Sequence, residues 1–170
     1  MRAFSVSFMG RVACALVAGL IVVAGMRLPL AAGAEGEVVA VDLKTFTFKV
    51  RAEIAELFGY NDGEGKLFYY TAGAGETTVK LPADGEYELS IKASCDPALN
   101  ERAKFKVTLD GQPVGMETLL TADDEKEYKL TATAKAGARK LAIEYTNDAY
   151  KENEYDRNFY VHGVTLKRLK

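Results

Sequence analysis

Apolar and polar residues alternate with period two along most of this chain. In residues 87–93 the apolar side chains of Tyr87, Leu89 and Ile91 alternate with Glu88, Ser90 and Lys92. Successive side chains of a strand point to opposite faces, so this pattern predicts a half-buried strand. The same pattern predicts further strands at residues 44–49, 66–72, 104–109, 127–134 and 140–145.

The segments between these strands carry the residues of tight turns. Residues 82–85 read Pro-Ala-Asp-Gly and residues 110–113 read Asp-Gly-Gln-Pro, and residues 63–65, 73–75 and 136–137 also contain glycine. We interpret all five as turns and none as a phosphate-binding loop. Only residues 52–58 look locally helical, and a single turn or a strand edge is the alternative. Many short strands separated by such turns predict an all-β antiparallel sandwich.

The last predicted strand, residues 158–169, is apolar at both parities. Its apolar residues are Phe159, Val161, Val164 and Leu166. A strand covered on both faces has this composition, so we expect it to lie centrally in a sheet.

The amino terminus has the three parts of a secretory signal peptide. A basic start with Arg2 and Arg11 is followed by an apolar run at residues 12–25 and a small-residue ending, Ala32-Gly33-Ala34. We expect cleavage after Ala34, which leaves one domain at residues 35–170. The apolar run is too short to span a bilayer, so we expect no membrane insertion after cleavage. The product would be secreted, periplasmic or attached to the cell surface.

Charge and cysteine content limit the partners and the source of stability. The chain has a formal charge of −2 and no basic block, which argues against a nucleic-acid surface. Cys95 is the only cysteine after the expected cleavage, so no intrachain disulfide can form. A buried, inert thiol is favoured over an intermolecular bridge.

Residues 146–158 are unusually rich in oxygen donors for a segment between two strands. Asp148 and Asp156 stand at its two ends, and a loop that folds back would bring these carboxylates together. Two close carboxylates repel each other unless a cation lies between them, and Ca²⁺ takes six to eight oxygen ligands. The spacing does not fit an EF-hand. From composition alone, a solvated polar loop and an ion site are equally good interpretations.

Two short motifs in this segment resemble calcium-dependent xylan-binding carbohydrate-binding modules. They are Thr146-Asn147-Asp148 and Asp156-Arg157-Asn158, and residues 81–87 and 110–114 resemble the family's upstream turns. The resemblance extends over about residues 60–166. It implies a jelly-roll-like β-sandwich with calcium at one end, shared between protein oxygens and adjacent sugar hydroxyls.

Site residues follow from the resemblance. Asp148 and Asp156 would supply carboxylate ligands to the ion, and Tyr155 a backbone carbonyl. Residues 59–62 would supply further backbone oxygens. Asn158 would stand beside the ligand and fix the loop. Independently of the resemblance, the rings of Tyr60, Tyr150 or Tyr155 could stack on the sugar. His162 replaces an Asp of many relatives and the loop at residues 151–155 is charged, which affects sugar specificity more than calcium.

The resulting hypothesis is an exported module, not an enzyme, that binds a xylan-like polysaccharide through Ca²⁺. A separate enzyme is a candidate partner. The alternative is a calcium-stabilised protein-interaction or envelope-structural sandwich that binds no glycan. An enzyme is less favoured because His162 is the only histidine, and because calcium would engage the two carboxylates that a glycosidase needs.

Overall fold

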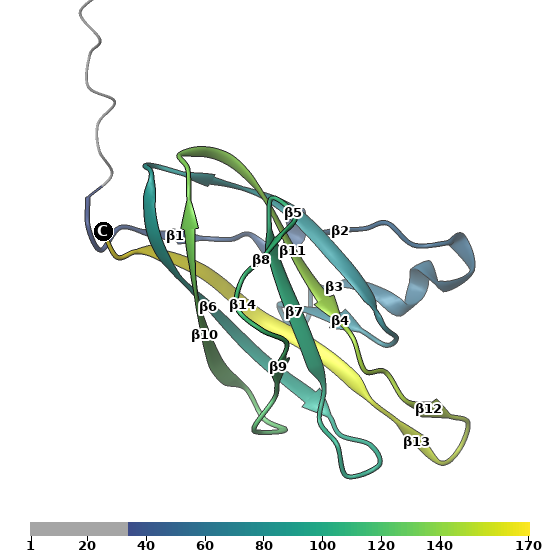
Figure 1. The fold of residues 1–170 in the computed structure, drawn as a ribbon. Coiled ribbons are helices and arrows are strands. Elements are labelled where there is room, and N and C mark those ends of the chain that lie inside the picture. Colours follow the sequence, from purple (N-terminus) through teal and green to yellow (C-terminus); the bar gives the residue numbers. More distant parts are fainter. Residues whose placement is uncertain (1–33) are drawn as a thin grey trace, which may run out of the picture.

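The computed structural model describes residues 34–170, which form two packed antiparallel sheets (Figure 1). The first sheet has the order β10-β6-β14-β4-β3, with β1 also on β14, and the second has the order β2-β5-β11-β7-β8, with β9 also on β7. The first contains β1 (Val38–Ala40), β3 (Phe58–Asn61), β4 (Lys66–Tyr69), β6 (Gly85–Asp96), β10 (Lys126–Ala134) and β14 (Asn158–Arg168). The second contains β2 (Thr47–Phe48), β5 (Gly73–Leu81), β7 (Lys104–Leu109), β8 (Gln112–Pro113), β9 (Thr118–Leu119) and β11 (Gly137–Tyr145). The predicted β-sandwich is confirmed.

Most strands lie where the alternation predicts them, and the segment before residue 60 is the main exception. At residues 44–49 only β2 forms, because Leu43–Thr45 makes a 3-10 turn, η1, in which the Asp42 side chain accepts a hydrogen bond from the Lys44 amide. A longer 3-10 helix, η2 (Ala52–Leu57), accounts for the helical pattern at residues 52–58.

The prediction of a turn at residues 73–75 is wrong, because these residues begin β5. Their glycines are required by packing. A Cβ at Gly73 would lie 2.7 Å from the ring of Phe58, and one at Gly75 would lie 2.7 Å from the Tyr69 hydroxyl and 2.8 Å from the Phe48 ring. Aromatic rings therefore cross directly over the backbone of this strand.

The central position of β14 is confirmed, but the reason given for it is wrong. The strand pairs with β6 along one edge and with β4 and β1 along the other. Its register with β6 shifts between Val161 and Gly163, which leaves His162 as an extra residue. This bulge changes the parity, so Phe159, Val161, Val164 and Leu166 are all buried in one core.

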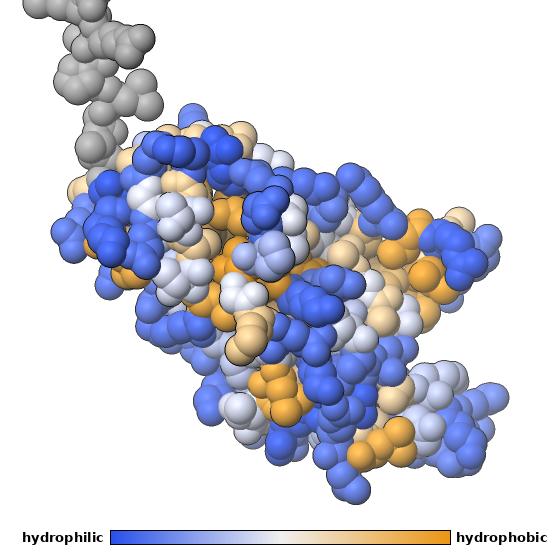
Figure 2. All heavy atoms as spheres, in the orientation of Figure 1, coloured by the Kyte–Doolittle hydropathy of each residue, from blue (hydrophilic) through white to orange (hydrophobic). Residues whose placement is uncertain are grey.

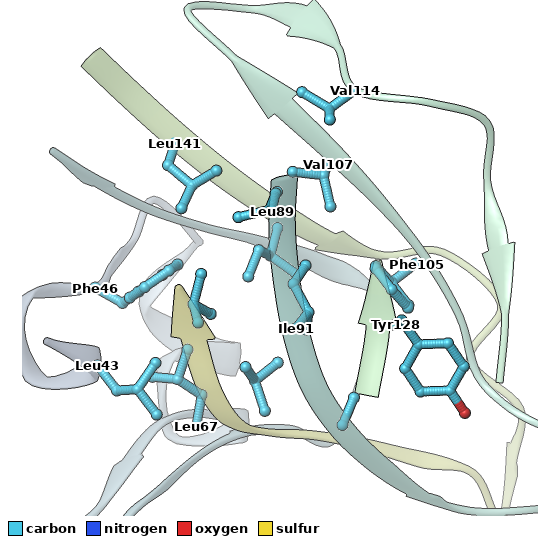
Figure 3. Packing of buried hydrophobic residues seen from close by; sticks show 14 of the residues in the cluster. Leu43, Phe46, Leu67, Leu89, Ile91, Phe105, Val107, Val114, Tyr128 and Leu141 are labelled. Carbon is cyan, nitrogen blue, oxygen red and sulfur yellow. The ribbon is translucent and has the colours of Figure 1, made fainter. Parts of the chain in front are cut away.

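The core lies between the two sheets (Figure 3). Phe159 of β14 is at its aromatic centre, with ring centroids 5.4 Å from Phe105 and 5.7 Å from Tyr145, both in stacked geometry. Cys95 is buried at the end of β6, as expected for an inert thiol. The face seen in Figure 2 is mostly hydrophilic, with several smaller apolar patches.

The expected signal peptide lies outside the described residues, apart from Ala34. Within residues 34–170, no helix is both long enough and apolar enough to cross a membrane.

The ring contact at Gly73 predicts a large effect of one methyl group. Gly73→Ala places a Cβ 2.7 Å from the buried ring of Phe58, so we expect a loss of about 1–3 kcal/mol in the free energy of unfolding, which denaturant titration measures. Gly63→Ala is the matched control, because its nearest neighbour is the Asn61 side-chain oxygen at 3.4 Å. Equal stability of both variants would contradict this packing.

Candidate functional site

A short hairpin closes one end of the sandwich and borders a cavity. Its strands are β12 (Tyr150–Lys151) and β13 (Tyr155–Asp156), and Figure 1 shows them projecting at the end opposite the carboxyl terminus. The cavity has a volume of about 640 Å³. It is lined by Leu57, Tyr70, Thr71, Asp148, Tyr150, Asp156, Asn158 and Tyr160.

The first two residues of Thr146-Asn147-Asp148 attach the loop to the neighbouring strand β7. The Thr146 amide donates to the Lys104 carbonyl at 3.0 Å. The Asn147 side chain accepts from the Lys104 amide at 2.6 Å and donates to the Arg102 carbonyl at 2.9 Å. These bonds fix the backbone immediately before Asp148.

Arg157 holds the other end of the loop from inside the protein. The whole residue is only 3% exposed. The guanidinium donates to the carbonyls of Glu101 (3.0 Å), Ala98 (2.6 Å) and Asn147. It also pairs with the Glu101 carboxylate at 3.5 Å. Arg157 therefore joins the segment after β6 to both halves of the loop.

Asp148 presents a buried oxygen that no described group satisfies. Its Oδ2 accepts a hydrogen bond from the Thr71 hydroxyl at 2.9 Å, whereas its Oδ1 is buried and has no partner within residues 34–170. Burial of a carboxylate oxygen without a donor or a cation is costly. Because Asp148 lines the cavity, its geometry suits a cation there.

Asn158 links two further carboxylates and leaves its own oxygen unpaired. Its Nδ2 donates to Asp96 at 3.1 Å and to Asp156 at 3.2 Å. The opposite orientation would set the amide oxygen against both carboxylates, so these partners determine the orientation. The Oδ1 is buried without a partner among the described residues, and Asn158 lines the same cavity as Asp148.

Asp96, Tyr70, Thr71 and Tyr160 belong to this site, and sequence reasoning missed them. Tyr160 donates its hydroxyl to Asp96 at 2.7 Å, and burial together with this bond raises the pKa of the phenol well above its usual value. The phenol therefore stays protonated at physiological pH. Tyr160 occupies a solvent-facing position of a central strand, and an aromatic residue at that parity was the available signal.

Aromatic side chains form one wall of the cavity. The ring of Tyr70 lies 6.3 Å from Tyr160 and 4.8 Å from Phe68, measured between centroids. Tyr150 is 63% exposed and Tyr70 is 40% exposed, so both rings offer free surface. Lys66 covers part of the Tyr160 ring, with its Nζ 4.0 Å from the centroid.

The structure brings Asp148, Asp156, Tyr150 and Asn158 to this cavity but not the other expected residues. Tyr155 lies next to it in β13, opposite Lys151. Tyr60 lines a separate hollow with Leu43 and His162. Residues 59–62 run away from the cavity, because Phe58 pairs with Tyr69 and Asn61 with Lys66. Leu57 and Thr71 line the cavity at the place where residues 59–62 were expected.

One known family resembles the part of the chain that includes this end of the sandwich. Residues 88–169 match the model of the family described as CBM60, Ca-dependent carbohydrate-binding module, xylan-binding. The resemblance to calcium-dependent xylan-binding modules is confirmed. The match includes both motifs of the loop and begins later than the resemblance inferred from sequence.

Two solved structures that are similar to this chain are carbohydrate-binding modules. The CBM36-1 domain of a multidomain xylanase from the hindgut metagenome of Trinervitermes trinervoides has a TM-score of 0.58 and 13% identity, covering 76% of this chain and 96% of that domain. The C-terminal CBM6 of LamC, a marine laminarinase from Zobellia galactanivorans, has a TM-score of 0.55 and 10% identity, covering 78% and 100%. At such identities the likeness shows the fold. No curated protein matches the chain by sequence.

The donor set of the cavity fits calcium better than a transition metal. Across residues 34–170, no group of three or more His, Cys, Asp and Glu side chains is placed to hold a metal ion. The cavity instead combines two carboxylates, an amide oxygen and hydroxyls. All these donors are oxygens, which Ca²⁺ prefers and zinc does not.

The buried guanidinium predicts that the loop depends on Arg157. Arg157→Met removes the donor to three carbonyls and would lower the free energy of unfolding by about 3 kcal/mol or more, because buried acceptors lose their partner. Arg102→Met is the control, since its pair with Asp123 is exposed and costs at most about 1 kcal/mol. Thermal and denaturant unfolding measure both. Equal losses of unfolding free energy in the two variants would contradict this role of Arg157.

Proposed function

We propose that this module is a non-catalytic binder of a xylan-like polysaccharide and that it holds the glycan through a calcium ion at the β12–β13 end. The unpaired, buried Oδ1 of Asp148 beside Asp156 carries the proposal. The family match, whose description is calcium-dependent and xylan-binding, supports the same assignment.

Asp148 and Asp156 would supply the charge that holds the ion, and the Tyr155 carbonyl would add a neutral ligand. Thr71 and Asn158 each donate to one of these carboxylates, which fixes its orientation. A bound calcium ion supplies positive charge and open coordination positions to which adjacent sugar hydroxyls can bind. Fixed carboxylates reduce the ordering needed when the ion enters.

The tyrosines would select the sugar that reaches this position. Tyr70 and Tyr150 offer exposed rings beside the carboxylates, and a pyranose packs its apolar C–H face on such rings. The unpaired Oδ1 of Asn158 is an acceptor for a sugar hydroxyl. Tyr60 lies in another hollow, so we do not include it in this contact.

The same geometry argues against hydrolysis at this cavity. A glycosidase needs one carboxyl group that carries a proton and a second that attacks or activates water. Ligation of one ion by Asp148 and Asp156 would leave neither group free for these roles. The export signal in residues 1–34, the single domain at residues 35–170 and a separate enzyme partner remain part of the proposal.

Removal of one carboxylate charge tests the calcium site. Asp148→Asn retains the size of the side chain and the contact with Thr71, but we expect it to abolish calcium binding in titration calorimetry after chelator treatment. Asp156→Asn is expected to do the same. The control is Asp62→Asn, because Asp62 lies in an exposed turn and pairs only with Lys44. Unchanged calcium affinity in both site variants would contradict the proposal.

A xylan panel with and without calcium separates the proposal from its alternative. Binding of xylan only in the presence of calcium supports a glycan-binding module. Calcium that raises the melting temperature without binding of any glycan indicates the protein-interaction or structural sandwich. Release of soluble sugar from the polysaccharide indicates an enzyme.

The aromatic wall predicts a separation of sugar binding from ion binding. Tyr70→Ala removes a partly exposed ring of the cavity and would weaken glycan binding about three- to tenfold, as expected for the loss of one aromatic contact. Calcium affinity would stay unchanged, because the phenol is not a proposed ligand. Leu119→Ala is the control for loss of an exposed apolar residue. Equal glycan affinity in both variants would remove Tyr70 from the site.

A further inference from the structure

A second hollow lies on the first sheet beside the bulge of β14, where neither β4 nor β1 pairs with that strand. β4 pairs with residues 159–161 of β14 and β1 pairs with residues 165–167, so neither strand reaches residues 162–164. The Val41 amide donates a hydrogen bond to the Val164 carbonyl at 3.0 Å across this gap. The hollow has a volume of about 440 Å³, within the range of small-molecule sites.

The bulge in β14 shapes the floor of this hollow. The extra residue, His162, points its Nε2 at the Ser94 hydroxyl, 2.7 Å away, and its Nδ1 lies 3.7 Å from Glu125. Gly163 follows it with no side chain. A Cβ there would meet nothing closer than Lys92 at 3.8 Å, so packing does not require a glycine. The missing side chain instead leaves the hollow open.

Ser90 supplies an unused polar group on the same floor. The residue is only 8% exposed and lines the hollow, yet its hydroxyl has no hydrogen-bond partner among residues 34–170. Because the hydroxyl oxygen keeps some exposed surface, a ligand in the hollow could form a hydrogen bond with it.

The remaining lining combines both charge signs with apolar surface. Asp42, Lys92 and Glu127 all line the hollow, and Lys92 pairs with Glu125 at 3.6 Å. Burial lowers the pKa of His162, so the imidazole is neutral at pH 7. This balance does not favour an anion. Tyr60, Val41 and Leu43 add apolar area beside these donors and acceptors. A small neutral ligand with many hydroxyls and an apolar face matches this lining.

We propose that this hollow is a second saccharide subsite, which binds one or two neutral sugar units without calcium. It shares no lining residue with the cavity at the β12–β13 hairpin. Sugar binding in this hollow is therefore independent of calcium binding at the hairpin and can be tested separately from it. If both sites act, one polysaccharide or two chains could be held at two points, which raises avidity without any new contact.

The test is an NMR titration of the full chain in excess EGTA with xylobiose, cellobiose and mannobiose. We expect at least one disaccharide to shift the amide signals of Ser90, Lys92 and Gly163, with half-saturation on the order of 1–10 mM. Asp148→Asn would bind that disaccharide equally well in EGTA. This variant separates failure of the second subsite from failure of the calcium site.

Two variants on the floor and one control decide the location. Gly163→Val fills the hollow and Ser90→Ala removes the unused hydroxyl, and each would weaken this binding about tenfold. Thr131→Val on β10 is the control, because its exposed side chain lies outside the hollow. If Gly163→Val loses its native spectrum, Ser90→Ala decides alone. The proposal is overturned if no disaccharide shifts these signals in EGTA, or if binding persists unchanged in Ser90→Ala.

Discussion

The buried guanidinium of Arg157 is the interaction on which the ligand-facing end of this protein depends. It donates to carbonyls of the segment after β6 and of the loop before β12, so chain segments distant in sequence share one set of hydrogen bonds. Its own carbonyl accepts from the Tyr145 hydroxyl at 2.9 Å. Tyr145 in turn stacks on Phe159 in the core. The hairpin at the edge of the cavity is thus tied to the centre of the sandwich, which limits the motion of Asp156 and Asn158.

The two motifs of the loop divide their residues between holding the fold and facing the cavity. Thr146, Asn147 and Arg157 use their polar atoms within the protein. Asp148 and Asn158 each keep one buried oxygen without a described partner. A loop that needed only rigidity would gain from satisfying those oxygens as well, because an unpaired buried acceptor reduces stability. Their arrangement is therefore better explained by a ligand than by folding.

Most strands could be predicted from the sequence, because each has one buried face and the alternation of apolar and polar residues follows that burial. The bulge at His162 could not be predicted. A shift of the buried positions by one residue gives the same pattern as a strand that is buried on both faces, until the register is known. Gly73 was wrongly assigned to a turn, because the sequence alone does not distinguish a glycine required by the Phe58 ring above it from a glycine in a turn. For the cavity, Asp148 and Asp156 were found through local motifs. Tyr70 and Asp96 were missed because their nearness to the loop arises from strand pairing far along the chain.

The absence of tryptophan from the chain helps to explain why an ion would be useful in binding a sugar. A neutral glycan must exchange hydroxyl–water bonds for hydroxyl–protein bonds of similar strength, so its affinity comes mainly from apolar contact or from a site that water satisfies poorly. Tyrosine rings give less contact area than indoles, and here Lys66 already covers part of the Tyr160 ring. Carboxylates fixed by Thr71 and Asn158 can compensate by holding a cation, whose interaction with hydroxyl oxygens is stronger than a neutral hydrogen bond. Affinity at this end would then depend on calcium, whereas the choice among sugars would depend on how Tyr70 and Tyr150 fit the ring beside it.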